Sequence, residues 1–211
     1  MNIKDVQRGI MNGSTDGRSA FFALVFRQKY IQRWGLMRNI SPESLSEHAA
    51  ECAVLTHALA TIANKKFGKS YDVGRAVSLA LFHDVPEVFT GDMPTPIKYA
   101  SSKMRAQFEE IEKQSVEGLI DKLPAEFRDE YRALILGDGT EDEELKRLVK
   151  SADRLCAYIK CIEEEKVGNR EFTRARLGIE KRLCDDGSPE LKYFIENFLP
   201  AFRLTLDEQQ D

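Results

Sequence analysis

Along most of the chain, apolar residues recur every three or four positions, which is the period of an amphipathic α-helix. We find no run of alternating β-branched residues that would predict a strand. Residues 1–19 carry Gly, Ser, Asn and Asp without apolar periodicity, so they are expected to form a mobile arm. The pattern over 20–211 predicts one all-α domain, a helical bundle of about seven to nine helices. Its later helices are expected over 102–122, 125–136, 141–167, 171–183 and 189–198.

Three earlier helices are marked by their ends. The first is expected to begin near Phe21 and to run toward Arg33. Two starting points are open for the second: residues 41–43, where Pro would take the first helical position, or residues 44–47, which form a capping box. A third helix is expected to start after Asp72. Two prolines then make the segment 91–96 the densest loop signal of the chain.

The composition of the 211 residues, 42% hydrophobic and 31% charged, is that of a chain able to bury its own core without disulfides. A net charge of -4 argues against binding to a nucleic acid polymer, which depends on surplus basic charge. No apolar run approaches the roughly 20 residues of a membrane span, and no signal-peptide core follows Met1. We therefore expect a cytoplasmic protein with no membrane partner, whose four cysteines are reduced and mostly buried.

The candidate chemistry centres on two of the three histidines. His83 and Asp84 end an apolar helix, and Glu87 follows within one helical turn. His48 lies in an otherwise apolar helix, and Asp153 lies at the edge of a helix face that should be buried. Two histidines and two carboxylates suit a divalent first-row metal that keeps a position open for water or substrate.

Simpler structural roles are open for the same side chains. Asp153 follows Lys150 and precedes Arg154, so it could pair with either. His48 could be a hydrogen-bonded core residue, and the His-Asp pair could cap its helix. His57 is expected on the face of its helix opposite His48, as an exposed or structural residue. The glutamate run 163–165 is expected to be a solvated face.

A resemblance to a known family favours the metal site. The motifs R-W-G-L-M-R-N (33–39), S-E-H (46–48), H-D-V-P-E-V-F-T-G-D-M-P-T-P-I-K (83–98) and K-S-A-D (150–153) carry it. Their order resembles the HD superfamily of metal-dependent phosphohydrolases. The combination of R-W with G-D-x-P-T-P looks more closely like the bacterial 5'-deoxynucleotidase family typified by YfbR. The similarity covers about residues 20–208, which implies one HD domain over 20–211.

The resemblance also implies roles for individual residues. The metal ligands would be His48, His83, Asp84 and Asp153. The catalytic residues would be Glu87 and Arg33. The substrate would be bound by Arg33, Trp34, His48, Asp84, Asp92, Met93, Pro94, Thr95 and Asp153.

The activity implied by the resemblance is hydrolysis of deoxyribonucleoside 5'-monophosphates by a cytoplasmic homodimer. One divalent ion would serve as cofactor, with cobalt, manganese or copper favoured and zinc as a further candidate. Large apolar residues beyond the needs of one stripe, over 191–202, are expected to contribute to the two-fold interface. Two alternatives are a different HD-type phosphohydrolase, acting on triphosphates or phosphodiesters, and a helical interaction module with a closed structural metal site.

Overall fold

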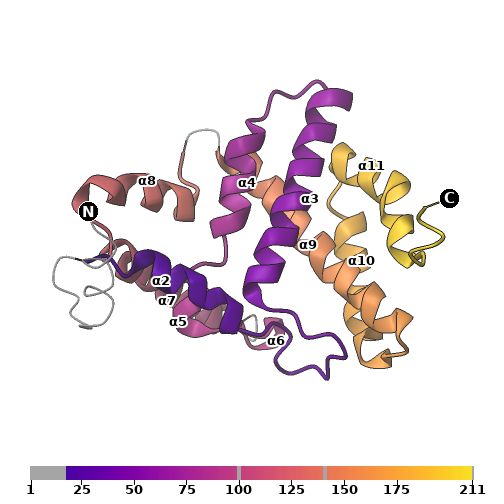
Figure 1. Cartoon of the computed structure of the whole chain (residues 1–211), viewed down its shortest axis with the longest axis horizontal. Coiled ribbons are helices and arrows are strands. Elements are labelled where there is room, and N and C mark those ends of the chain that lie inside the picture. The colour runs from indigo at the N-terminus through magenta and orange to yellow at the C-terminus, as the bar shows by residue number, and fades with distance from the viewer. Residues whose placement is uncertain (1–17, 99–100, 140–141, 211) are drawn as a thin grey trace, which may run out of the picture.

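The computed structural model describes residues 18–98, 101–139 and 142–210, and every regular element within these ranges is a helix (Figure 1). The predicted all-α fold is confirmed. Almost all of the expected arm over 1–19 lies outside the described residues. Seven of the described helices have nine or more residues: α3 (Leu45–Lys66), α4 (Val73–Phe82), α7 (Ser102–Ile120), α8 (Ala125–Leu136), α9 (Asp142–Lys166), α10 (Thr173–Cys184) and α11 (Pro189–Asn197).

Short helices complete the fold and contain several residues of interest. Three are α-helical: α2 (Phe21–Val25), α5 (Glu87–Thr90) and α6 (Thr95–Lys98). Three are 3₁₀ turns: η1 (Phe26–Tyr30), η2 (Arg170–Phe172) and η3 (Leu199–Arg203). Within the described ranges, no helix combines the length and apolar character that a membrane span requires.

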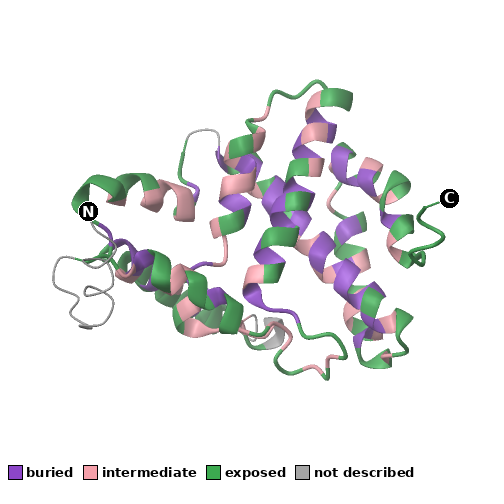
Figure 2. Ribbon diagram, viewed as in Figure 1, coloured by how far each residue is buried: buried purple, intermediate pink, exposed green. Residues whose placement is uncertain are grey.

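The core lies where α3 packs against α4 and α9, with α10 and α11 covering the side away from α4 (Figure 1). Buried positions line the inner faces of these helices, while their outer faces are exposed (Figure 2). A second apolar cluster brings α2 and α7 onto the turn that follows α4, and buries Val85 completely. Because Val85 lies between Asp84 and Glu87, this second cluster fixes the turn that carries both acidic residues.

The capping box at Ser44 is the start of α3. The Ser44 hydroxyl accepts a hydrogen bond from the backbone N–H of Glu47, and the Glu47 carboxylate accepts one from the backbone N–H of Ser44 at 2.7 Å. A cap of this kind stabilises a helix by about 1 kcal/mol. It places His48, fully buried, in the first turns of α3. The alternative start at residues 41–43 is wrong, and Glu43 instead lies buried outside the helix.

The first helix is shorter than the apolar pattern predicts. It ends at Val25, the 3₁₀ turn η1 ends at Tyr30, and the chain then becomes extended at Ile31. Two backbone hydrogen bonds of 2.9 Å join this extended stretch to the residues just before α3, from Arg33 N–H to the Glu43 carbonyl and from Leu45 N–H to the Ile31 carbonyl. These hydrogen bonds between two segments of the chain take the place of helical ones, so Arg33 lies in a loop and not at a helix end.

The apolar residues of the C-terminal segment are mostly used inside the chain. Leu191, Phe194 and Leu199 are buried in the main core, and of the large apolar side chains between 191 and 202 only Phe198 is exposed. Tyr193, Ile195 and Phe202 are partly buried, so the apolar surface left in this segment is smaller than the sequence pattern predicts, and its part in a two-fold interface stays a prediction.

Candidate active site

The four predicted metal ligands converge from three helices. His48 comes from the first turns of α3, His83 and Asp84 from the end of α4, and Asp153 from the middle of α9. Ligand atoms of His48, His83 and Asp84 all lie within 4.8 Å of one another. The Asp153 Oδ1 atom lies 3.3 Å from His48 Nε2, and the Asp84 Oδ2 atom lies 3.1 Å from His83 Nε2. Residues far apart in the sequence therefore present nitrogen and oxygen ligands to one point.

Both histidines direct an unsatisfied nitrogen toward this point. The Nε2 atoms of His48 and His83 are buried and lack a hydrogen-bond partner of good geometry, which is costly for a polar atom. The Nδ1 atom of His83 lies 2.6 Å from the Ala80 carbonyl, which only accepts, so Nδ1 carries a proton, and in the neutral ring Nε2 keeps its lone pair. This second interaction is the usual way in which a metal-ligating histidine is oriented. The donor set thus fits a divalent metal ion.

Asp153 faces the site, contrary to the simpler structural role. Its Oδ1 atom lies 3.7 Å from Arg33 Nη2, in addition to its approach to His48. Arg154, the neighbour that could have paired with Asp153, instead forms an ion pair of 2.8 Å with Asp186. The two consecutive side chains of α9 therefore serve different partners.

The charges of the site favour ionised carboxylates. Burial would raise the pKa of Asp84, but His83, His48 and Arg33 outweigh it and hold that pKa below its ordinary value. Burial likewise opposes ionisation of Asp153, yet its interaction with His48 keeps the pKa lowered. Burial would lower the pKa of His83, but Asp84 raises it above its usual range, so a proton and a metal ion compete for this ring.

Glu87 is the buried acid of the site. The spacing predicts Glu87 within one helical turn of His83 and Asp84; in the structure α4 ends at Phe82, and Glu87 begins the separate short helix α5 after a turn. The backbone N–H of Glu87 donates to the Asp84 carbonyl at 3.0 Å, which keeps the two residues adjacent. Burial, with the charges of Asp84 and Asp92, raises the pKa of Glu87 to about 9, and its Oε2 atom has no hydrogen-bond partner. Such a perturbed carboxyl is typical of an acid–base catalyst.

Arg33 contacts the Nδ1 atom of His48, the ring nitrogen that points away from the ligand cluster, and Trp34 follows Arg33 in the chain. The Arg33 Nη1 atom donates to Glu43 Oε1 at 2.8 Å and lies 2.7 Å from His48 Nδ1. Burial opposes the charge of Arg33, but Glu43 and Asp153 outweigh it and raise the pKa of Arg33 above its ordinary value. The Trp34 ring packs against Phe172 with ring centroids 5.3 Å apart.

The predicted nucleotide-contacting loop is joined to this pair through Asp92. The Asp92 carboxylate accepts a hydrogen bond of 3.0 Å from the backbone N–H of Trp34, and burial raises the pKa of Asp92. Met93 and Pro94 follow as half-buried residues, and Thr95 begins α6, while the side chain of Thr95 lies outside the described part. The structure therefore brings Asp92 to the site, and the roles of the next three residues stay predictions.

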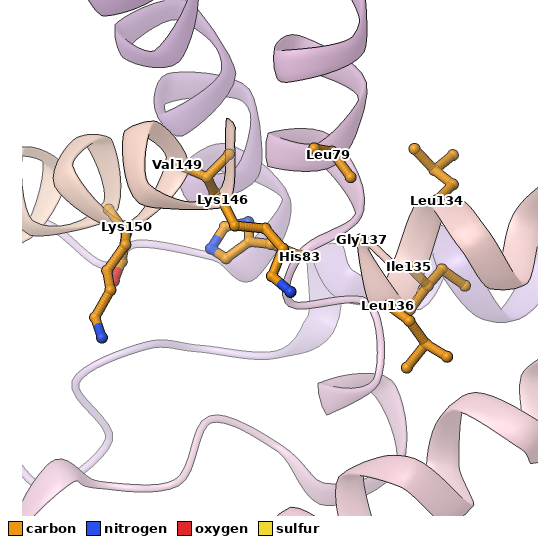
Figure 3. Close-up of a pocket in the computed structure, with 10 residues that line it drawn as sticks. Leu79, His83, Leu134, Ile135, Leu136, Gly137, Lys146, Val149 and Lys150 are labelled. Carbon is orange, nitrogen blue, oxygen red and sulfur yellow. The ribbon is translucent and has the colours of Figure 1, made fainter. Parts of the chain in front are cut away.

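A cavity of about 280 Å³ opens beside the ligands, between α4, α8 and α9 (Figure 3). Asp153 forms part of its wall. His83 also lines it, as do Lys146 and Lys150 from α9 (Figure 3). The ligand cluster can therefore be reached by small molecules. An accessible cluster is typical of a catalytic metal centre, whereas a structural centre is closed by its protein ligands.

Sequence reasoning missed one buried residue of the site. Glu43 contacts Arg33 and also accepts a hydrogen bond from the Trp34 indole N–H at 2.9 Å. In the sequence it appeared only as a helix-start residue. The available signal was its place between the R-W and S-E-H motifs, directly before the capping box.

Known proteins resemble the chain in sequence and in fold. The family model for YfbR-like 5'-deoxynucleotidases matches residues 20–202. A 5'-deoxynucleotidase of Shewanella oneidensis is 45% identical over 190 residues, which cover 90% of this chain and 97% of that protein. The 5'-deoxynucleotidase YfbR of Shigella dysenteriae is 47% identical over 191 residues, covering 90% and 96%.

Solved structures agree on the fold. An HD-domain phosphohydrolase from Listeria innocua superposes with a TM-score of 0.75 at 21% identity, over 90% of this chain and 91% of that one. The HD phosphohydrolase of cyanophage S-2L, solved with dA and one catalytic Zn²⁺ ion, gives a TM-score of 0.61 at 20% identity, over 87% and 96%. The fold is therefore that of the HD-domain phosphohydrolases, and with the family match over most of its length, the chain belongs to the YfbR-like 5'-deoxynucleotidase family.

Proposed function

We propose that this enzyme hydrolyses deoxyribonucleoside 5'-monophosphates at one divalent ion held by His48, His83, Asp84 and Asp153. The observation that carries the proposal is the convergence of two buried, unpartnered Nε2 atoms with two ionised carboxylates. Cobalt, manganese or copper is the metal that the family resemblance favours. Zinc is the further candidate, supported by the Zn²⁺ ion of the cyanophage protein.

The side chains around the ligands suit hydrolysis of a phosphate monoester. A bound divalent ion neutralises phosphate charge and lowers the pKa of a water molecule. Glu87, whose buried Oε2 atom is free, would be ionised once bound cations offset the charge of Asp84. It would then accept the proton of the attacking water as the new P–O bond forms and pass a proton to the 5' oxygen, which leaves as a hydroxyl when the old bond breaks. Arg33 holds the phosphate oxygens through its planar guanidinium and orients the ester for attack.

Selection of the sugar is assigned to Trp34. Trp34 follows Arg33 in the chain. Its backbone N–H donates a hydrogen bond to Asp92 and its indole N–H donates one to Glu43, so its position is fixed. We propose that the indole packs against the 2' position of the sugar, where a ribose hydroxyl would be crowded and unpartnered. The loop from Asp92 to Thr95, which Asp92 joins to the Trp34 backbone, would also contact the nucleotide.

We further propose that the enzyme is a cytoplasmic homodimer, on the strength of the family resemblance alone. Velocity sedimentation at micromolar concentration checks for the dimer, and a species of monomer mass only would contradict it.

A phosphate-release screen tests the function. The protein is incubated with deoxy- and ribonucleoside monophosphates, a deoxynucleoside triphosphate and a cyclic nucleotide, each with cobalt, manganese, copper or zinc. Orthophosphate from the deoxy monophosphates is expected. Pyrophosphate or triphosphate release would instead identify a triphosphohydrolase, and hydrolysis of the cyclic nucleotide a phosphodiesterase.

A variant on α9 and one in the turn after α10 give a matched pair for this screen. Asp153→Asn is expected to lose both bound metal and turnover. Asp186→Asn, which removes the partner of the adjacent Arg154, is expected to keep both. Full metal content and turnover in Asp153→Asn would show that Asp153 is not a ligand.

A further inference from the structure

Glu43 is a buried carboxylate whose hydrogen-bond partners belong to the active site. It is 8% exposed and lies just outside α3. Its Oε1 atom accepts from Arg33 Nη1 at 2.8 Å, and its Oε2 atom accepts from Trp34 Nε1 at 2.9 Å. A buried charge is tolerated only when it is paired and hydrogen-bonded, and here both oxygens are used by neighbouring residues of one loop.

The backbone reinforces the same connection. Arg33 N–H donates to the Glu43 carbonyl at 2.9 Å, and Gln32 forms an isolated antiparallel bridge with Ser44. The R-W loop and the residue before the helix cap are thus held together by main chain and side chains. A carboxylate fixed in this way can set the directions of the guanidinium and the indole.

Trp34 needs such support because its backbone is strained. Its φ of 60° is in the left-handed region, the only such non-glycine residue in the described part of the chain. That conformation is unfavourable for an L-residue because its Cβ atom approaches the following carbonyl oxygen. It persists where surrounding contacts determine it, and here these are the bonds to Glu43 and Asp92 and the packing on Phe172.

Glu43 also faces a metal ligand. Its Oε1 atom lies 3.6 Å from His48 Nδ1. Arg33 Nη1, which is closer at 2.7 Å, can only donate, so in this arrangement His48 Nδ1 accepts from Arg33. Binding of a metal through Nε2 would move the His48 proton to Nδ1, and Glu43 is the nearby carboxylate that can accept it once the Arg33 contact gives way.

We infer that Glu43 is a positioning residue that orients Arg33 and Trp34 toward the nucleotide and supports His48 as a metal ligand. The inference rests on the proposed roles of those three residues. It adds to them a single residue on which metal affinity and sugar selectivity both depend.

The variant Glu43→Gln tests this inference, because it keeps the shape of the side chain and replaces one acceptor by a donor. Zinc affinity, measured by competition with a chromophoric chelator, is expected to fall about 10- to 100-fold, the usual effect of losing a carboxylate behind a ligating histidine. The ratio of kcat/KM for a deoxy and a ribo monophosphate of one base is expected to decrease. Since Trp34 is the only tryptophan, its indole N–H gives one NMR resonance, which is expected to move upfield.

Asp142→Asn is the matched control. Asp142, like Glu43, is a buried carboxylate; it is the first residue of α9, whereas Asp153 lies in the middle of that helix, and it is held by two hydrogen bonds from Arg75. It should lower the melting temperature while zinc affinity and the sugar ratio stay unchanged. A purely structural role for Glu43 would make the two variants behave alike, and that result would overturn the inference.

The unaltered protein provides a measurement that does not depend on folding of the variant. Titration with Zn²⁺ is expected to move the Trp34 indole resonance, because Glu43 changes its partners when His48 becomes a ligand. An indole resonance that stays in place while zinc binds would also overturn the inference. If the unaltered protein neither binds zinc nor releases phosphate, the proposed function itself fails, which is a different outcome.

Discussion

At the scale of single residues, the site separates acid–base chemistry from binding. Glu87 contributes no atom to the converging cluster of His48, His83 and Asp84, yet it is buried within one turn of Asp84 and has a free oxygen. This separation allows each group to be tested by itself.

Glu87→Gln is expected to lower kcat by roughly 10²-fold or more, the usual scale of acid–base assistance. Metal content and substrate binding should persist, because the amide keeps the shape of the side chain. Steady-state kinetics and elemental analysis of the purified variant check this. Metal loss in Glu87→Gln would make the residue a ligand or a determinant of the fold.

Trp34→Ala is expected to narrow the preference for deoxyribonucleotides. Crowding of a ribose hydroxyl by the ring, with no hydrogen-bond partner, should cost about 1–3 kcal/mol, which is roughly a 10- to 200-fold preference. The measurement compares kcat/KM for a deoxy and ribo pair of one base. Arg33→Ala is the comparison, since loss of a phosphate contact should weaken both sugars alike; an undiminished preference in Trp34→Ala would refute the assignment.

At the scale of elements, α9 holds more than a metal ligand. The glutamate run 163–165 was expected to be solvated, which is wrong for Glu164, because this residue is 1% exposed. Its carboxylate accepts hydrogen bonds of 3.0 Å from the backbone N–H groups of Ile40 and Ser41, and it pairs with Lys160. The last turns of α9 therefore fix the segment that leads to Glu43 and the cap of α3.

This anchor makes stability depend on acid pH. Burial opposes ionisation of Glu164, but Lys160 and the backbone donors outweigh it and lower the pKa of Glu164 to about 2. A lowered pKa in the folded state means that the contribution is complete above the unfolded value of about 4.3 and is lost as pH falls through about 2. The ionised Glu164 carboxylate contributes about 3 kcal/mol to the free energy of unfolding.

Chemical denaturation between pH 6 and pH 2 checks this expectation. The unaltered protein and Glu164→Gln should differ most in free energy of unfolding above about pH 5 and converge toward pH 2. Glu117→Gln, on the exposed face of α7, is the control and should show little difference at any pH. If the difference in free energy of unfolding between the unaltered protein and Glu164→Gln does not change with pH, the anchoring role of the ionised carboxylate is contradicted.

The elements that the sequence predicts well are those whose signals are local. Helix α8 begins and ends at the predicted residues 125 and 136, and the caps at Ser44 and Asp72 are confirmed. The positions of Arg33 and Glu43 depend on hydrogen bonds between separate segments, which no periodicity records. The motifs predicted which residues meet, whereas only the fold shows what holds them.

At the scale of the whole molecule, a bound metal would connect α3, α4 and α9. A ligand that binds only the native state stabilises it, by about 2.7 kcal/mol at a free concentration 100 times Kd. For a chain of this size, we expect the melting temperature to rise by several degrees with metal and to fall with chelator. Scanning calorimetry with and without zinc checks this, and Asp153→Asn should lose the shift; an equal shift in that variant would place the metal elsewhere.

The meeting of three helices at one ion has a consequence inside the cell. When metal is scarce, newly made chains fold without their ion, open more often, and present cleavable backbone to proteases. Scarcity would then reduce the amount of enzyme as well as the activity of each molecule. The ligand cluster would thus link the abundance of the protein to the supply of its metal, with no separate sensor required.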